Sequence, residues 1–96
     1  MKKCVFYSMM KIEGIPCAIQ HTGYQDNGIW YYKNKNVWQA ISPENGLMIA
    51  HGLTRKEAAE NATTPEMLKH LAHFLASDAG QRARTRFIKA VEEAEA

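Results

Sequence analysis

Cysteine is scarce in this sequence, and the two thiols form no motif. Cys4 and Cys17 make no C-x-x-C pair, and two cysteines in 96 residues are too few for the disulfide framework of a small secreted domain. The two could pair only if their strands were adjacent. We therefore expect two reduced, half-buried thiols.

Long apolar runs are missing as well. No stretch approaches the roughly 20 apolar residues of a membrane-spanning helix. The apolar stretch that follows Met1-Lys2-Lys3 ends at Lys11, and no small-residue cleavage site comes after it. The sequence thus predicts no membrane partner and no signal peptide, which favours a cytoplasmic location.

Catalytic motifs are also lacking. Neither cysteine has a His or Asp partner at the spacing of a known signature, and no G-x-S-x-G elbow occurs. The six glycines stand singly at expected turns instead of forming a phosphate-binding loop. We therefore expect no enzymatic activity and no cofactor, and a protein that works by binding.

The composition is that of an ordinary globular domain. Hydrophobic residues make up 46% of the chain and charged residues 23%, which is wrong for a disordered chain. The length predicts a single domain over 1–96 with one modest core. The net charge of +2 is too small to indicate nucleic-acid binding by itself.

The chain divides into a strand-rich first half and a helix-rich second half. β-Branched and aromatic residues predict strands over 4–10, 15–21, 29–33, 37–42 and 47–51, with turns over 22–28 and 43–46. Capping residues predict helices over about 55–61 and from 65 onward, and a last helix over about 79–94, after an interruption at Ser77 and Gly80. The predicted fold is α+β, an antiparallel β-meander of four to five strands followed by two to three C-terminal helices.

The helices carry apolar stripes at the helical period. In the second predicted helix, which begins at 65, the stripe is Leu68, Leu71, Ala72 and Leu75. In the last helix it is Ala83, Phe87, Ala90, Val91 and Ala94. We expect Trp38, Leu71 and Phe87 to be buried in the core.

The aromatic strands place apolar residues on both faces of the predicted sheet. Pairing Tyr32 with Val37 and Ala40 with Ile49 gives one face with Ile29, Tyr31, Trp38, Ala40, Leu47 and Ile49, and a second with Trp30, Tyr32, Val37, Ile41, Met48 and Ala50. The helices can cover only one face. Either the N-terminal strands fold over the other, or it is an exposed patch for a partner or a second copy. Aromatic residues beside lysines are also typical of surfaces that stack the bases of single-stranded nucleic acids. The candidate binding residues on these strands are therefore Trp30, Tyr32, Lys33 and Lys35.

Histidines provide a candidate metal site. Glu66, His70 and His73 fall on one face of the second helix, where a carboxylate and two imidazoles could hold a divalent ion completed by His51 or a partner chain. Alternatively, Glu66 and His70 form an i,i+4 pair on a wet face. The second interpretation is preferred, because no fourth ligand is evident, so no metal is expected.

The last helix holds the clearest charge signal. Four cations crowd its first half, Arg82, Arg84, Arg86 and Lys89, while Glu92, Glu93 and Glu95 crowd its end. This order opposes the helix dipole, which favours acids first and bases last. The cluster therefore predicts an anionic partner, either a nucleic-acid backbone or an acidic protein surface.

Two resemblances bear on function. The segment from Gly52 to Ala62 (GLTRKEAAENA) resembles the strand-to-helix junction G-x-T-x-x-E-A-x-x-N-A of HicB-type antitoxins, which implies a meander running into this helix and a nucleic-acid-binding antitoxin or repressor. In size and general character the chain also resembles small phage-encoded accessory proteins, including anti-CRISPR and anti-restriction proteins. That resemblance implies inhibition or regulation of a larger protein or ribonucleoprotein complex, which is the leading hypothesis.

Overall fold

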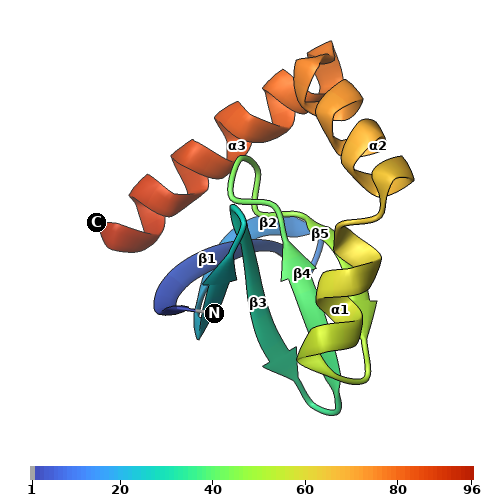
Figure 1. Ribbon diagram of the computed structural model, residues 1–96. Helices are drawn as coiled ribbons and strands as arrows, with labels where there is room; N and C mark the ends of the chain where they lie inside the picture. Colours follow the sequence, from blue (N-terminus) through green and yellow to red (C-terminus); the bar gives the residue numbers. More distant parts are fainter. Residues whose placement is uncertain (1) are drawn as a thin grey trace.

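A computed structural model describes residues 2–96 as a five-stranded antiparallel sheet followed by three helices (Figure 1). The strands lie in sequence order in the sheet and are β1 (Lys2–Ile12), β2 (Ile15–Asp26), β3 (Ile29–Asn34), β4 (Val37–Ile41) and β5 (Met48–Gly52). The helices are α1 (Arg55–Ala62), α2 (Pro65–Ala76) and α3 (Asp78–Glu95). The predicted α+β meander is confirmed. Within residues 2–96, no helix combines the length and apolarity needed to cross a membrane.

The predicted turn over 22–28 is wrong for residues 22–26, because β2 continues to Asp26. Only Asn27 and Gly28 turn the chain, both with positive φ. Gly23 lies inside the strand, where a Cβ would collide with the Tyr31 carbonyl oxygen and come 2.9 Å from the Phe6 ring. This glycine therefore serves a close approach between backbones and not a turn.

The hairpin of β1 and β2 curls over the sheet. β2 pairs with β3 only from Tyr24 to Asp26, so most of the hairpin is free to bend away. The bent hairpin reaches the loop between β4 and β5, where the Met9 amide donates to the Gly46 carbonyl oxygen at 2.8 Å. The N-terminal strands thus cover the second sheet face, as the first alternative predicted.

The second hydrophobic cluster shows how this cover is made. Phe6 from β1 packs with Tyr32 and Ile41, and its ring stacks on Trp30 with 5.1 Å between the centroids. The hypothesis of an exposed aromatic face is therefore wrong for Tyr32, which is 7% exposed, and for Trp30, which is half-buried. Met48, expected on the same face, is exposed.

Strand registers differ from the simplest ones. Tyr32 pairs with Gln39 and not with Val37, since Lys35 and Asn36 alone make the turn. This slip of two residues leaves the assignment of the β3 and β4 faces intact. Between β4 and β5 a bulge beside Ala40 shifts the register, so that Ala40 pairs with Ala50 instead of Ile49. Ala50 therefore lies on the sheet face opposite to the one predicted for it.

The main core lies between the sheet and α1. Ile29, Tyr31 and Ala40 pack there against Ala58 and Ala62, and both alanines are fully buried. Trp38, predicted to be buried, lies half-buried beside this cluster.

Residues of the segment from Gly52 to Ala62 hold α1 in place. Thr54 caps the helix by accepting from the Glu57 amide at 3.0 Å, and the Asn61 side chain donates to the His51 carbonyl oxygen at 2.9 Å. A Cβ at Gly52 would come 2.6 Å from the Ala58 nitrogen, so the strand and helix meet too closely for any side chain. The residues Gly52, Thr54 and Asn61 of the HicB-like motif therefore have structural roles at the junction of β5 and α1.

A sharp corner joins α2 to α3. The Ser77 hydroxyl donates to the Phe74 carbonyl oxygen at 2.6 Å and accepts from the Gly80 amide at 3.1 Å, so one residue ends α2 and begins α3. Gly80, which was predicted to interrupt α2, lies instead within the first turn of α3 and packs against the Phe74 backbone. The corner is fixed by these contacts. The two helices consequently form an open angle above the sheet (Figure 1).

Candidate partner-binding surface

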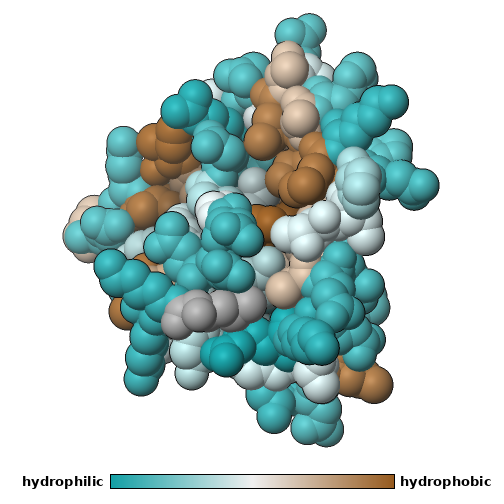
Figure 2. Space-filling model, viewed as in Figure 1, coloured by the Kyte–Doolittle hydropathy of each residue, from teal (hydrophilic) through white to brown (hydrophobic). Residues whose placement is uncertain are grey.

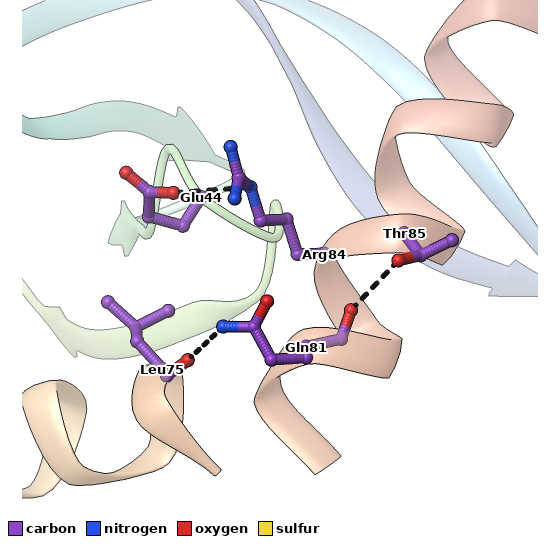
Figure 3. A network of polar contacts seen from close by, with 5 residues as sticks. All are labelled: Glu44, Leu75, Gln81, Arg84 and Thr85. Atoms are coloured by element: carbon purple, nitrogen blue, oxygen red, sulfur yellow. Dashed lines mark hydrogen bonds and ion pairs between the residues drawn. The ribbon is translucent and has the colours of Figure 1, made fainter. Parts of the chain in front are cut away.

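The four predicted cations of α3 do not form one cluster. Arg82, Arg86 and Lys89 are spaced at i, i+4 and i+7 and share one helix face. Arg84 points away from them toward the β4–β5 loop, where its Nε lies 3.7 Å from Glu44 Oε2 (Figure 3). Both partners of this ion pair are about half exposed, so it contributes little to stability. The structure thus separates Arg84 from the other three.

We call Arg82, Arg86 and Lys89 the basic face. All three are exposed and, with Gln81 and Thr85, line an open hollow of about 440 Å³. Among residues 2–96 there are two ion pairs, Lys56 with Glu60 and Arg84 with Glu44, so none involves the basic face. Its cations are free to meet an external anion.

Two further charges border the basic face. Lys11 of β1 lines a smaller hollow of about 110 Å³ together with Arg86, and this lysine extends the positive surface onto the hairpin. Glu93 lies one turn beyond Lys89 and lines a neighbouring hollow with it. The positive charge is therefore concentrated toward the N-terminal half of α3.

An apolar groove lies between α2 and the start of β5. It has a volume of about 270 Å³, and its lining residues are Asn45, Leu47, Met48, Ile49, Met67, His70, Leu71 and Phe74. No residue of α2 is fully buried, so the apolar side of this helix remains partly open. In Figure 2 apolar surface fills the angle between α2 and α3.

The β4–β5 loop joins the groove to the basic face. Asn45 Oδ1 accepts from the Leu47 amide at 3.0 Å, and the Gly46 amide donates to the Ser42 carbonyl oxygen at 2.8 Å. This tight turn presents Leu47 at the surface. Asn45 and Leu47 line both the apolar groove and the hollow that contains Lys11 and Arg86, so the two surfaces are continuous.

The aromatic candidates lie elsewhere. The Tyr32 hydroxyl donates to Gln39 Oε1 at 2.7 Å inside the curled sheet. Lys33 and Lys35 are exposed, at the end of β3 and in the β3–β4 turn. That turn is at the opposite end of the sheet from α3 (Figure 1). The structure therefore does not join Trp30, Tyr32, Lys33 and Lys35 to the basic face.

One polar pair was missed by sequence reasoning. Ser8 Oγ lies 2.7 Å from His21 Nε2, and the His21 ring stacks on Tyr32 with centroids 3.8 Å apart. A hydroxyl beside an imidazole has the geometry of a nucleophile and its base. Ser8 is only 2% exposed, however, and burial lowers the pKa of His21. Thirteen residues separate the two in sequence, so only the β1–β2 register could have revealed them.

The candidate metal ligands share a hollow on α2. Glu66, His70 and His73 line it together with Lys69. Within residues 2–96 no group of three or more His, Cys, Asp or Glu side chains is arranged to hold a metal ion. Cys4 pairs in register with Gly23 and Cys17 with Met10, so the two thiols are far apart along the hairpin and both are free, as predicted.

Sequence reasoning also missed most of the groove. Met67, Leu71 and Phe74 are spaced at i, i+4 and i+7, a signal as strong as the predicted stripe of Leu68, Leu71, Ala72 and Leu75, which shares only Leu71 with the groove. Leu68 instead is exposed. The stripe on α3 was placed correctly, since Phe87 is buried.

Comparisons of the chain with protein-family models, with curated proteins and with solved structures find no match. The resemblances to HicB-type antitoxins and to phage accessory proteins stay predictions.

Proposed function

We propose that this protein is a non-enzymatic binding protein that inhibits or regulates a larger protein or nucleoprotein complex, and that the basic face makes the electrostatic contact. One observation carries the proposal. Arg82, Arg86 and Lys89 stand together on an exposed helix face, and none of the ion pairs among the described residues involves them.

The energetics of α3 support a binding role for this face. Arg82 and Arg86 carry like charges at i, i+4, and their repulsion costs a few tenths of a kcal/mol. Neither arginine lies in the first turn of α3, so the helix dipole adds little to this cost. An anionic partner would offset the repulsion between the two arginines.

Burial of the hydroxyl–imidazole pair supports binding over catalysis. A substrate would have to reach Ser8, which lies on β1 with only 2% of its surface exposed. The basic face, in contrast, lies entirely in solvent on a helix that is anchored by Phe87.

The alternative function is a HicB-like nucleic-acid-binding antitoxin or repressor. It is favoured by the segment from Gly52 to Ala62, since a meander strand does run directly into α1 at this segment. The weight of that observation is reduced by the structural tasks of Gly52, Thr54 and Asn61.

Affinity capture from a lysate of the native host tests the proposal. Wild-type protein should retain a larger protein or nucleoprotein complex, and the triple variant Arg82→Glu, Arg86→Glu, Lys89→Glu should lose it. Arg84→Glu is the matched control, because it reverses one charge on the other side of the same helix. Circular dichroism should show that all variants stay folded. Equal capture by the triple variant and wild type would refute the role of the basic face.

A further inference from the structure

We propose that the apolar groove accepts large apolar side chains of an acidic segment of the partner protein, whose carboxylates meet the neighbouring basic face. This inference rests on the proposed function and names the chemistry of the partner. It makes the partner a protein and assigns Leu47, Met48, Leu71 and Phe74 a role in binding.

The groove is suited to an adaptable apolar contact. Leu47 is 38% exposed and Met48 is 52% exposed, and both follow the tight turn that Asn45 fixes. Methionine side chains at 48 and 67 flank the groove, and their flexible thioethers adapt to differently shaped partners. Exposed apolar residues gathered in this way mark interaction surfaces.

The size of the groove indicates a side-chain anchor. Its volume of about 270 Å³ lies below the roughly 300–1,000 Å³ that is typical of small-molecule sites. Protein interfaces are commonly anchored by a few large side chains that fill pockets near their centre. The groove therefore fits one or two such anchors better than a free metabolite.

Charges at both ends of the groove select an acidic segment. At the end shared with Asn45 and Leu47, the neighbouring hollow holds Lys11 and Arg86. At the other end, His70 is shared with a hollow that holds Lys69 and one carboxylate, Glu66. The flanks are net positive, so carboxylates on either side of an apolar anchor would be attracted.

The lining argues against a nucleic acid in the groove itself. Single-strand binders stack bases on aromatic platforms along a charged channel. Here the lining holds two rings, the half-buried Phe74 and the imidazole of His70, and apart from Asn45 the other lining residues are Leu, Ile and Met. An apolar side chain matches this surface better than a base does.

Fluorescence anisotropy with synthetic probes tests the inference. The first probe is a labelled acidic peptide with Leu and Phe at helical spacing, the second has the same charge with Leu and Phe replaced by Ser, and the third is a labelled oligothymidylate. Wild-type protein should bind the first probe, and Met48→Glu should weaken that binding about tenfold or more, as loss of an anchoring contact does. Leu53→Glu is the control, because Leu53 is 71% exposed and lies outside the groove.

Each outcome decides the inference. Equal binding of the apolar and the serine peptides, or an unchanged affinity in Met48→Glu, would overturn it. Preference for the oligothymidylate would overturn it, and so would a concentration-dependent dimer, seen by analytical ultracentrifugation, that Met48→Glu abolishes. Host complex captured equally by Met48→Glu and wild type, yet lost in the triple variant of the basic face, would refute the groove while leaving the proposed function standing.

Discussion

The Phe87 ring lies directly on the backbone of Gly46, so closely that a Cβ built at position 46 would come within 2.5 Å of the ring. Gly46 has a φ of 70°, a conformation that glycine adopts without strain. Its carbonyl oxygen also accepts from the Met9 amide. This one loop residue therefore links α3, the β4–β5 loop and the curled hairpin, and it sets the position of the basic face.

Removing the Phe87 ring should loosen that link. Because Phe87 is 7% exposed, Phe87→Ala should lower the free energy of unfolding by about 3–5 kcal/mol, as expected for a buried aromatic. Ile88→Ala is the matched control on the exposed side of the same helix and should change it by about 0.5 kcal/mol or less. Urea unfolding followed by circular dichroism measures both. Similar midpoints for the two variants would show that α3 does not depend on this contact.

Most elements of the fold could be predicted because their signals are local. Each of these signals lies within about four consecutive residues, as for the helix caps Thr54 and Thr64 and the turn at Gly46. The curl of the β1–β2 hairpin could not be predicted, since it depends on how far β2 pairs with β3. That single unknown decided whether Trp30 and Tyr32 face solvent or Phe6.

His21 should make stability depend on pH. Burial lowers the pKa of His21 below its ordinary value of 6.5, so the unfolded chain takes up a proton before the folded protein does. Stability should then be full above pH 6.5 and fall as the pH drops from there through the folded pKa.

Urea unfolding at a series of pH values measures this effect. His21→Gln should flatten the dependence below neutral pH, whereas His73→Gln, on the exposed face of α2, should leave it as in wild type. A wild-type protein whose stability does not fall on acidification would contradict the prediction, and so would an undiminished slope in His21→Gln.

The candidate site was predictable in part. The charge pattern of α3 predicted a single cluster of four cations, Arg82, Arg84, Arg86 and Lys89. Arg82, Arg86 and Lys89 are exposed and Arg84 is partly exposed, but helical spacing alone would have set Arg84 apart. The apolar groove depends on the corner at Ser77, which fixes α2 beside Leu47. Ser77 and Gly80 predicted a break between the two helices but not its angle, which is set by the packing of Gly80 on the Phe74 backbone.

Metal removal should have no effect. Lys69 lies in the same hollow as Glu66, His70 and His73, and its positive charge opposes a cation there. We expect EDTA to leave the melting temperature unchanged, as measured by differential scanning fluorimetry with and without added zinc. A melting temperature that zinc raises and EDTA lowers would show that these three side chains hold a metal after all.

Salt dependence should separate the two candidate functions. Each phosphate contact made by a cation contributes a log–log slope of about −0.9 on duplex DNA and about −0.7 on single strands. The three cations of the basic face would thus give a total slope of roughly −2 to −3 for a nucleic-acid partner. If the partner is a protein, DNA and RNA should not bind appreciably near physiological salt.

Anisotropy titrations with labelled duplex and single-stranded oligonucleotides, repeated over a range of salt concentrations, measure this slope. We expect weak binding that vanishes near physiological salt and is equally weak in Arg84→Glu. For the protein partner, reversal of the basic face should mainly slow association, because exposed interfacial charges act on the association rate more than on the dissociation rate. Tight oligonucleotide binding at physiological salt, lost on reversal of Arg82, Arg86 and Lys89, would instead establish the antitoxin or repressor alternative. In that case the basic face would be a phosphate-binding surface, and the inhibitor hypothesis would be wrong.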